Sequence, residues 1–342
     1  CGVRHRADLG RGRLQVGLVI PRRVGLVFPG QGSQTVGMGR ALCDSDPQAR
    51  SVFERADRAA GFALMRTCFE GPEEALRLTA VTQPAILATS LACFEALAAQ
   101  GPSEWRRGIT CAAGHSLGEY SALVAAGSLD LEDAVRTVRR RGEYMQEAVP
   151  VGQGAMAAVL GMPLADVEAL CRDAAEGEVL APANLNAPDQ TVVAGSAAAV
   201  NRLAALARER GAKRTILLPV SAPFHCELMA PAQKRLAKDL EALRLRDAEI
   251  PVILNVSARP ETRSEALRQA LIEQVTRPVR WVESMLRMKD LGVEVLAEIG
   301  PGRVLSGLAK RIVPEMPLLN VEDPVSLKSA SEALGLARGE TA

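Results

Sequence analysis

The sequence predicts an α/β fold in which a mostly parallel sheet is covered by helices on both faces. Three observations support this prediction. Short apolar runs alternate with helical patterns along most of the chain, as they do in parallel sheets. Residues 114–118 read G-x-S-x-G between an apolar run and a helical pattern. Residues 151–221 follow a different order, βαββαβ, which indicates a smaller inserted subdomain.

The composition limits the classes of protein to which this chain can belong. The chain has 342 residues, of which 48% are hydrophobic, so one large or two modest domains can bury a core. The net charge of +1 creates no overall field that favours nucleic acid or membrane surfaces. No apolar run approaches the roughly 18 residues of a membrane span. The scattered cysteines and three histidines indicate no metal site and a reducing compartment.

Residues 1–22 differ from the rest of the chain, because they carry many arginines and show no helical period. Their positive charge is typical of a transit peptide, but the serines that are usual in such peptides are absent. An extension produced by an upstream start site is the alternative interpretation. We expect this basic extension to be disordered or non-native and to lie outside the fold. We expect the protein in the bacterial cytoplasm, with organellar targeting by the extension left open.

The large catalytic domain is predicted in two pieces, residues 23–150 and 222–325. It begins with a buried strand at Val24–Phe28 and a glycine-rich loop at 29–34. The loop matches neither Walker A nor G-x-G-x-x-G, so it either faces an anion or only makes a tight connection. Helical patterns follow from residue 38 and at 47–60, 72–78, 83–99 and 131–148, the last with Asp130 as N-cap.

Ser116 lies in the G-x-S-x-G motif, between the apolar run 109–113 and a helical pattern at 120–126. A strand, a sharp turn and a helix are what a nucleophile elbow requires, because the turn lifts the serine hydroxyl above the sheet. The flanking glycines permit the strained turn, and the first helical amides offer N–H groups to a developing negative charge. The alternative is a Gly/Ser-rich connection without chemistry.

The inserted subdomain is predicted at residues 151–221. Strands at 155–160, 179–185, 191–195 and 214–220 and helices at 164–174 and 197–210 give a ferredoxin-like order, with the hairpin at 186–189. The large domain then resumes with helices at 229–243, 265–276, 281–291 and from 305, and with strands at 251–256 and 293–299. The polar tail at 326–342 is expected to be frayed or a weak helix.

A serine nucleophile needs a proton acceptor, and three histidines are available to supply one. His5 lies in the basic extension. His115 adjoins Ser116, and neighbouring side chains of an elbow project in different directions. His225 remains, in the loop where the subdomain returns to the large domain, and we interpret it as the base rather than as a structural histidine. No acidic residue between Ser116 and His225 is marked as a third member.

Three consecutive arginines, at 139–141, lie on the helix predicted at 131–148. With Val138 at the centre of the apolar face and about 100° per residue, the first two arginines point toward solvent. Arg141 lies at the edge of the buried face, where a guanidinium needs an anionic partner or costs several kcal/mol. That partner is either a Glu from another helix or a carboxylate of the substrate held in a bidentate fork.

Several motifs in one order make the chain similar to the malonyl-CoA:acyl carrier protein transacylase family of type II fatty acid synthesis. They are FPGQGSQ (28–34), GHSLGEY (114–120), RGEYMQEAVP (141–150), NAPDQTVVAG (186–195), PFHCELM (223–229) and EIGPGRVLSGL (298–308). The resemblance covers residues 24–320. The fold of this family, a hydrolase-like core with a ferredoxin-like insertion, agrees with the predicted order of elements.

The resemblance implies a role for each catalytic candidate. Ser116 would attack the malonyl thioester, and His225 would take its proton and return it to the departing CoA thiol. The backbone amides of Gln31 and Leu117 would form the oxyanion hole. The main-chain carbonyl of Gln274 would orient the histidine, which would explain why no acid was found.

The resemblance also implies the substrates and the residues that contact them. Arg141 would bind the free malonyl carboxylate, and Phe224 would favour malonyl over methylmalonyl. His115 would line the substrate site. Malonyl-CoA and holo-acyl carrier protein would be the partners of a monomer that binds neither nucleic acid nor membrane. The CoA thioester enters as a substrate, and no bound cofactor or metal is implied.

The implied reaction is a ping-pong transfer through a malonyl-serine intermediate. A trans-acting polyketide acyltransferase is the nearest alternative, followed by a serine thioesterase or esterase. A carrier-docking module without activity is a further alternative. The joint presence of Ser116, His225 and Arg141 argues against it, because a module that had lost its activity would be expected to have lost at least one of these residues.

Overall fold

The computed structural model describes residues 23–220 and 222–336. The predicted basic extension at 1–22 lies outside the described residues. So do residue 221, at the end of the predicted subdomain, and residues 337–342 of the predicted tail.

A six-stranded sheet lies at the centre of the larger part of the fold. Its strands are β10 (Leu318–Val321), β9 (Val295–Ile299), β1 (Val24–Phe28), β2 (Ile109–Gly114), β7 (Val252–Ile253) and β8 (Pro260–Glu261), in that order across the sheet. Neighbouring strands are parallel except for the edge pair β7 and β8. The predicted mixed fold with a mostly parallel sheet is therefore confirmed. The sequence analysis missed β8 and β10 and predicted a longer β7.

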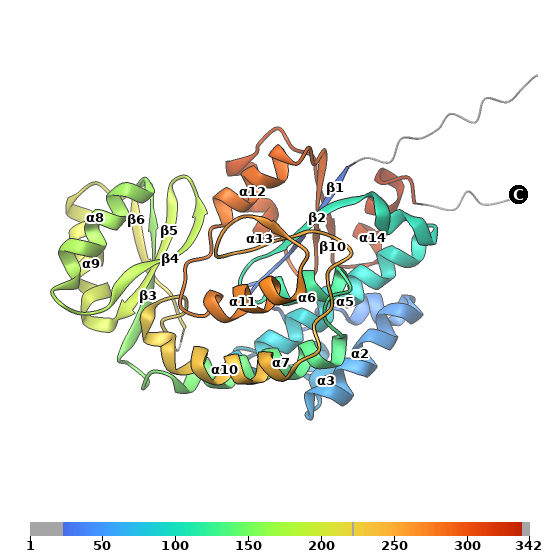
Figure 1. Ribbon diagram of the computed structural model, residues 1–342, viewed down its shortest axis with the longest axis horizontal. Coiled ribbons are helices and arrows are strands. Elements are labelled where there is room, and N and C mark those ends of the chain that lie inside the picture. Colours follow the sequence, from blue (N-terminus) through green and yellow to red (C-terminus); the bar gives the residue numbers. More distant parts are fainter. Residues whose placement is uncertain (1–22, 221, 337–342) are drawn as a thin grey trace, which may run out of the picture.

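Helices cover this sheet, mostly close to the predicted positions (Figure 1). They are α1 (Arg40–Ser45), α2 (Pro47–Ala60), α3 (Leu64–Glu70), α4 (Glu73–Leu76), α5 (Thr79–Gln100), α6 (Gly118–Ala125), α7 (Leu131–Glu147), α10 (Ala230–Ala242), α11 (Ser264–Gln274), α12 (Trp281–Asp290), α13 (Val304–Ile312) and α14 (Pro324–Ala333). Short 3₁₀ turns at Ser103–Gly108 and Glu227–Met229 complete this part of the fold.

Burial on both faces of the sheet follows from the alternation of side chains along a strand. In β1, Leu26 and Phe28 pack in one core cluster with α2, α5 and α7. Val27 points the other way, into a second cluster with α12 and α13. Every residue of β1 is buried, which is the pattern of a central parallel strand.

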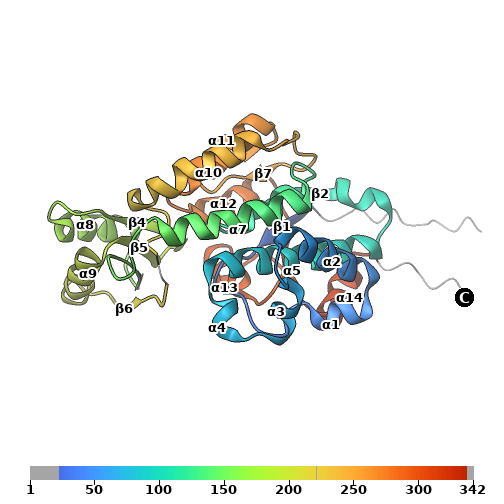
Figure 2. The ribbon, with the colours of Figure 1, turned by 90° about the horizontal axis from the view of Figure 1, so that it is seen from below.

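The helix α7, which carries the three arginines, crosses the molecule between α10 on one side and α2 and α5 on the other (Figure 2). Asp130 stands at its N-cap position, as predicted, but its side chain makes no capping hydrogen bond. The carboxylate instead pairs with Arg246 at 2.7 Å, because that arginine approaches from the segment after α10. Asp130 is therefore the N-cap residue that the sequence predicts, although its side chain pairs with Arg246 rather than with the helix backbone.

Two elements, α5 and α14, each differ in one respect from what the sequence predicts. By length and composition α5 is apolar enough to cross a membrane, but 83% of its most apolar stretch is buried inside the protein, so it is a core helix. The tail expected at 326–342 to be frayed or a weak helix contains most of α14, so the helix alternative holds for this part, and a capping box at Asp323 and Ser326 closes the N-terminus of the helix. Leu327 and Ala330 of α14 are buried in the main core.

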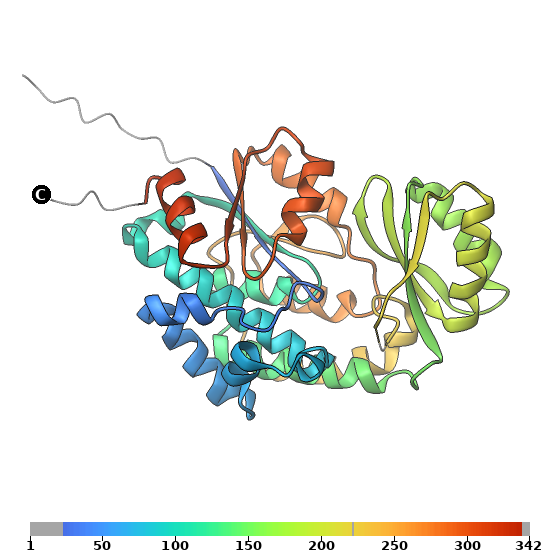
Figure 3. The ribbon, with the colours of Figure 1, turned by 180° about the vertical axis from the view of Figure 1, so that it is seen from behind.

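A second, four-stranded sheet lies at one end of the molecule. Its strands are β4 (Leu180–Ala187), β5 (Gln190–Ser196), β3 (Gly154–Leu160) and β6 (Arg214–Leu217), in that order and all antiparallel. The helices α8 (Leu164–Ala175) and α9 (Ala197–Glu209) cover its outer face (Figure 3). Its inner face packs against Phe224 and Cys226, so the loop that carries His225 runs along the junction of the two sheets.

The two parts of the fold are also joined through backbone hydrogen bonds. Leu185 N–H donates to the carbonyl of Val279, and Val279 N–H donates to the carbonyl of Ala183, each at 2.9 Å. This short parallel bridge connects β4 to the segment between α11 and α12. It brings the residues of β4 beside the G-x-S-x-G turn.

Candidate active site

Ser116 lies in the turn between β2 and α6, at the C-terminal end of a central parallel strand. Its backbone has a φ of 51°, in the left-handed region that non-glycine residues rarely adopt. Two buried side chains hold this conformation. Ser116 N–H donates to Asn255 Oδ1 at 2.8 Å, and Gln274 Nε2 donates to the Ser116 carbonyl at 2.9 Å. The turn presents the hydroxyl to the junction of the two sheets.

Close packing explains the glycines on either side of the serine. A Cβ on Gly118 would lie 2.1 Å from the carbonyl oxygen of Phe28 at the end of β1, and one on Gly114 would lie 1.8 Å from the Gly118 backbone. Both contacts are with backbone atoms, which have no alternative rotamer. The helix α6 can therefore approach the sheet this closely only where side chains are absent.

We expect Gly118→Ala to destabilise the fold by about 3 kcal/mol or more, because the new methyl group must displace either β1 or α6. Urea unfolding followed by circular dichroism measures this loss. Gly307→Ala is the matched control, since a Cβ at that helical position meets nothing within 4 Å. There the substitution should stabilise by up to about 1 kcal/mol. Equal midpoints for the two variants would contradict the packing argument.

His225 contacts Ser116 in the structure. Its Nε2 lies 2.7 Å from the serine Oγ, and its Nδ1 lies 2.8 Å from the main-chain carbonyl of Gln274. A carbonyl oxygen only accepts, so Nδ1 carries the proton and Nε2 is left to accept from the serine hydroxyl. Burial and the nearby Arg141 guanidinium lower the pKa of His225 to about 3, which keeps the imidazole neutral. Within the described chain no carboxylate hydrogen-bonds to this histidine.

Arg141 is only 2% exposed, deeper than its predicted place at the edge of the apolar face. Its guanidinium donates to Gln83 Oε1 at 2.8 Å, to Gln274 Oε1 at 2.9 Å and to Ser116 Oγ at 3.1 Å. These acceptors are neutral, and none of the described carboxylates lies within ion-pair distance of it. Its Nε also lacks a partner among the described residues. The alternative of a direct ion pair with a helix Glu is therefore wrong.

Of the two arginines before it, Arg140 points toward solvent as the helical geometry predicts, whereas Arg139 is less exposed than expected. Arg139 is partly buried; it pairs with Glu143 at 3.1 Å and lies over the Phe62 ring. Arg140 is exposed and lies 3.3 Å from Asp239. Of the three, only Arg141 reaches the serine.

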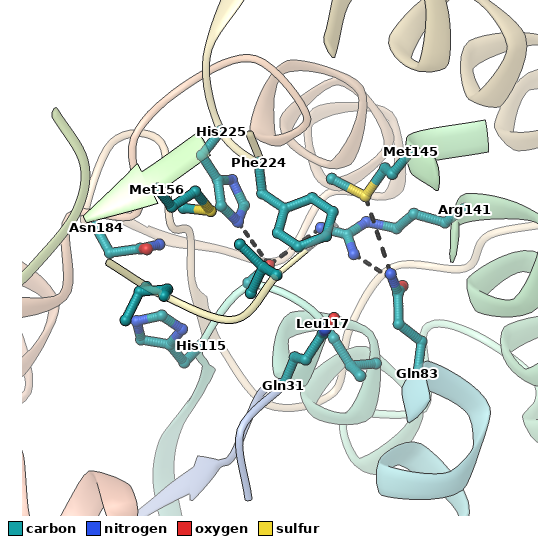
Figure 4. Close-up of a pocket in the computed structure, with 13 residues that line it drawn as sticks. Gln31, Gln83, His115, Leu117, Arg141, Met145, Met156, Asn184, Phe224 and His225 are labelled. Carbon is teal, nitrogen blue, oxygen red and sulfur yellow. Dashed lines mark hydrogen bonds between the residues drawn. The ribbon is translucent and has the colours of Figure 1, made fainter. Parts of the chain in front are cut away.

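The residues around the serine line a pocket of about 110 Å³ (Figure 4). Gln31, from the loop after β1, and Leu117, directly after the serine, lie on one side of it. Phe224 lies beside His225 on the opposite side, as the figure shows. His115 also reaches the pocket, but its Nε2 contacts Asn186 Oδ1 at 2.8 Å. Burial lowers the pKa of His115, so this ring too is neutral.

Several pocket residues were missed by the sequence analysis. Gln83 lies near the start of the mostly apolar helix α5 beside other polar residues such as Thr79 and Thr82, so the sequence does not single it out. The other lining residues that were missed are the polar Asn184 and the apolar Met145, Met156, Leu218 and Val220. Asn255 lies outside the pocket lining but holds the Ser116 turn, and no local pattern connects it to a serine 139 residues away. In residues 23–220 and 222–336 no group of three His, Cys, Asp or Glu side chains could hold a metal ion.

A serine at the end of a parallel strand, hydrogen-bonded to a neutral histidine beside a buried arginine, defines an α/β enzyme of the class that transfers acyl groups through serine. Comparison with known proteins agrees. The model of the acyl transferase domain family matches residues 26–322, and the chain belongs to this family.

Relatives within the family share nearly their whole length with this chain. The "Malonyl CoA-acyl carrier protein transacylase" of Escherichia coli K12 is 46% identical over 306 residues, which are 90% of this chain and 98% of the relative. The solved structure of the transacylase of that name from Coxiella burnetii is 43% identical, with a TM-score of 0.88 over 92% of this chain and 98% of that one. A second structure, also 43% identical (TM-score 0.87), shows a malonyl-transacylase in complex with a type II polyketide acyl carrier protein. It covers 91% of this chain, and 99% of its own chain is matched.

Proposed function

We propose that this acyltransferase moves the malonyl group of malonyl-CoA to the phosphopantetheine thiol of holo-acyl carrier protein and so supplies extender units for fatty acid synthesis. The relatives carry the name of this reaction over nearly their full length. The observation that carries the proposal is the Arg141 guanidinium, a buried cation whose acceptors among the described residues are all neutral and which lies 3.1 Å from the serine Oγ. A free carboxylate on the acyl group is the anion that this position requires.

In the first half-reaction, Ser116 is the nucleophile and His225 the general base. The serine O–H proton moves to His225 Nε2 as Oγ bonds to the thioester carbon. The backbone N–H groups of Gln31 and Leu117 stabilise the resulting oxyanion, each worth about 3–4 kcal/mol in comparable sites. The C–S bond then breaks, and the proton passes from Nε2 to the CoA sulfur. The enzyme is left as a malonyl ester of Ser116.

The second half-reaction repeats these steps with another thiol. The carrier's phosphopantetheine S–H gives its proton to His225 Nε2 as sulfur attacks the ester carbon. The same two N–H groups hold the oxyanion. The C–Oγ bond breaks, the serine oxygen recovers the proton, and the malonyl thioester leaves on the carrier. The Gln274 carbonyl holds the histidine tautomer throughout, so no acidic third residue is needed.

Selectivity follows from charge and shape. Acetyl and longer acyl groups carry no free carboxylate that could neutralise the charge of Arg141. Phe224 reduces the room beside His225, which favours malonyl over branched methylmalonyl. His115 contacts the substrate from the side of Asn186. Burial between the two sheets excludes water, which would otherwise hydrolyse the ester.

The finer architecture belongs to the same proposal. Ser116 is the tip of a nucleophile elbow, supported by its φ of 51° between β2 and α6. The core is hydrolase-like, built from residues 23–150 and 222–325. Residues 151–221 form a ferredoxin-like subdomain, supported by the order β4-β5-β3-β6 with two helices on one face. We propose that the protein acts as a monomer in the bacterial cytoplasm, without a bound cofactor.

A polyketide carrier is the second candidate acceptor, because one structural neighbour is a malonyl-transacylase bound to such a carrier. The chemistry at Ser116 is the same for both acceptors. Transfer rates to purified holo-carriers from the same organism distinguish them.

The function is tested with a panel of acyl-CoAs and intact-mass measurement. We expect a malonyl adduct on Ser116 that forms faster than acetyl or methylmalonyl adducts and is discharged quickly by holo-carrier and slowly by water. Rapid discharge by water, with no acceleration by the carrier, would identify a thioesterase instead. Failure of malonyl-CoA to acylate the serine would overturn the proposal.

A further inference from the structure

Glu119 is a buried carboxylate that the mechanism above does not use. It lies in the first turn of α6, three residues after the nucleophile, and is 1% exposed. Its Oε2 accepts two hydrogen bonds, from Asn255 N–H at 3.1 Å and from Gln274 Nε2 at 2.8 Å. A charged carboxylate this deep in a core is costly unless another charge offsets it.

The Gln274 side chain connects this carboxylate to Arg141. Its Nε2 donates to Glu119 and to the Ser116 carbonyl, and its Oε1 accepts from Arg141 at 2.9 Å. The amide dipole therefore lies with its N–H end toward the negative group and its oxygen toward the positive one. Both charges favour this orientation of the amide. A flipped amide would turn its oxygen toward the carboxylate and its NH₂ group toward the guanidinium.

This arrangement compensates the charge of Arg141 without occupying its guanidinium. A carboxylate in direct contact would form a bidentate pair and fill the donors that a substrate carboxylate needs. Held on the far side of the Gln274 amide, the carboxylate still attracts the guanidinium, and Arg141 Nε keeps no hydrogen-bond partner among the described residues. The guanidinium therefore stays 3.1 Å from Ser116 Oγ before the substrate binds.

We propose that Glu119 is a positioning residue that acts through the Gln274 side chain as the indirect counter-ion of Arg141, and so sets the preference for acyl groups with a free carboxylate. This inference rests on the proposed function, because it takes Arg141 to be the carboxylate-binding residue. It adds a specific expectation. Loss of the charge at position 119 should weaken malonyl selectivity more than it weakens acyl transfer itself.

The pH dependence of selectivity gives a test that needs no variant. Burial raises the pKa of Glu119 to about 7, against the opposing effects of Gln274, Asn255 and Arg141. The titratable or charged groups that face it are Arg141 from α7 and Tyr120 on its own helix, and burial raises the pKa of Tyr120 further above neutrality. With the pKa of His225 at about 3, Glu119 is the group of this network that titrates near neutral pH. Below pH 7 it gains a proton and loses its charge.

The experiment measures serine acylation by malonyl-CoA and by acetyl-CoA between pH 6 and 8.5, in the wild type and in Glu119→Gln. We expect the malonyl-to-acetyl ratio of the wild type to fall as pH drops through about 7. In Glu119→Gln the ratio should be about tenfold lower at pH 8, the size of one lost charged hydrogen bond, and independent of pH. Glu119→Asp should recover part of the ratio, since it restores the negative charge on a shorter side chain.

Glu298→Gln is the matched control. Glu298 is also buried and accepts backbone N–H bonds from Leu305 and Ser306, but it lies in β9, outside the residues that line the pocket. Its loss should lower stability and leave the malonyl-to-acetyl ratio unchanged. A ratio that is flat with pH in the wild type and equal in Glu119→Gln would overturn the inference while leaving malonyl transfer intact. A wild type without malonyl preference would overturn the proposed function instead.

Discussion

Replacing Ser116 with alanine is expected to abolish malonyl transfer, lowering kcat/KM for malonyl-CoA by at least about 10⁴-fold. In the proposed mechanism the Ser116 oxygen carries the acyl group between the two half-reactions, and its removal leaves His225 Nε2 without a proton to accept. The fold should survive, because the backbone bonds from Asn255 and Gln274 that hold the turn do not involve Oγ. Carrier malonylation followed by mass spectrometry, with the melting temperature measured in parallel, checks both expectations.

Ser121→Ala is the control for this change. Ser121 lies in α6, and its buried hydroxyl has no hydrogen-bond partner among the described residues. Its removal should leave the transfer rate within about twofold of the wild type, since no described contact is lost. Transfer by Ser116→Ala above a trace level would show that another residue carries the acyl group, and the nucleophile assignment would then fail.

The pairing of Ser116 with His225 was predictable because few alternatives existed. The chain has three histidines, and the position beside the serine and the position in the basic extension were both unsuitable. The structure brings the remaining histidine to 2.7 Å from the hydroxyl. The role of the Gln274 carbonyl came only from the family resemblance, since a main-chain acceptor leaves no signal in side-chain chemistry.

Helix geometry was sufficient to single out Arg141 but not to identify its partners. The period of 3.6 residues places it beside the apolar face whatever surrounds the helix. Its acceptors, Gln83 and Gln274, lie 58 and 133 residues away in sequence. Such contacts depend on how three separate helices pack, and local pattern holds no information about that. The sequence analysis missed Glu119 for the same reason, although it belongs to the G-H-S-L-G-E-Y motif.

Errors in the fold occurred where local signals are weak. The edge strands β8 and β10 and the two-residue strand β7 are too short to show a period of two. The helix α14 was underestimated because half of its residues are polar, although Asp323, Pro324 and Ser326 form a recognisable helix start. Long buried elements such as β1 and α2 were predicted to the residue, because core burial imposes a clear pattern.

Replacing Arg141 with alanine is expected to remove the preference for malonyl-CoA. The rate of malonyl-serine formation should fall by about 10²–10³-fold, which corresponds to losing a buried charged pair worth about 3–4 kcal/mol. Acetyl-CoA makes no such pair, so its rate should stay level or rise as the buried positive charge is removed. The malonyl-to-acetyl ratio, measured from the initial rates of the two adducts, reports the difference directly.

Two further variants separate charge from geometry at this position. Arg141→Lys retains the positive charge but cannot form a bidentate fork, so the ratio should fall less than in Arg141→Ala. Arg140→Ala removes an exposed arginine one residue earlier, whose partner Asp239 lies at 3.3 Å, and should change neither rate. If Arg141→Ala kept the selectivity of the wild type, the buried guanidinium would be structural. The malonyl carboxylate would then have to be recognised elsewhere in the pocket.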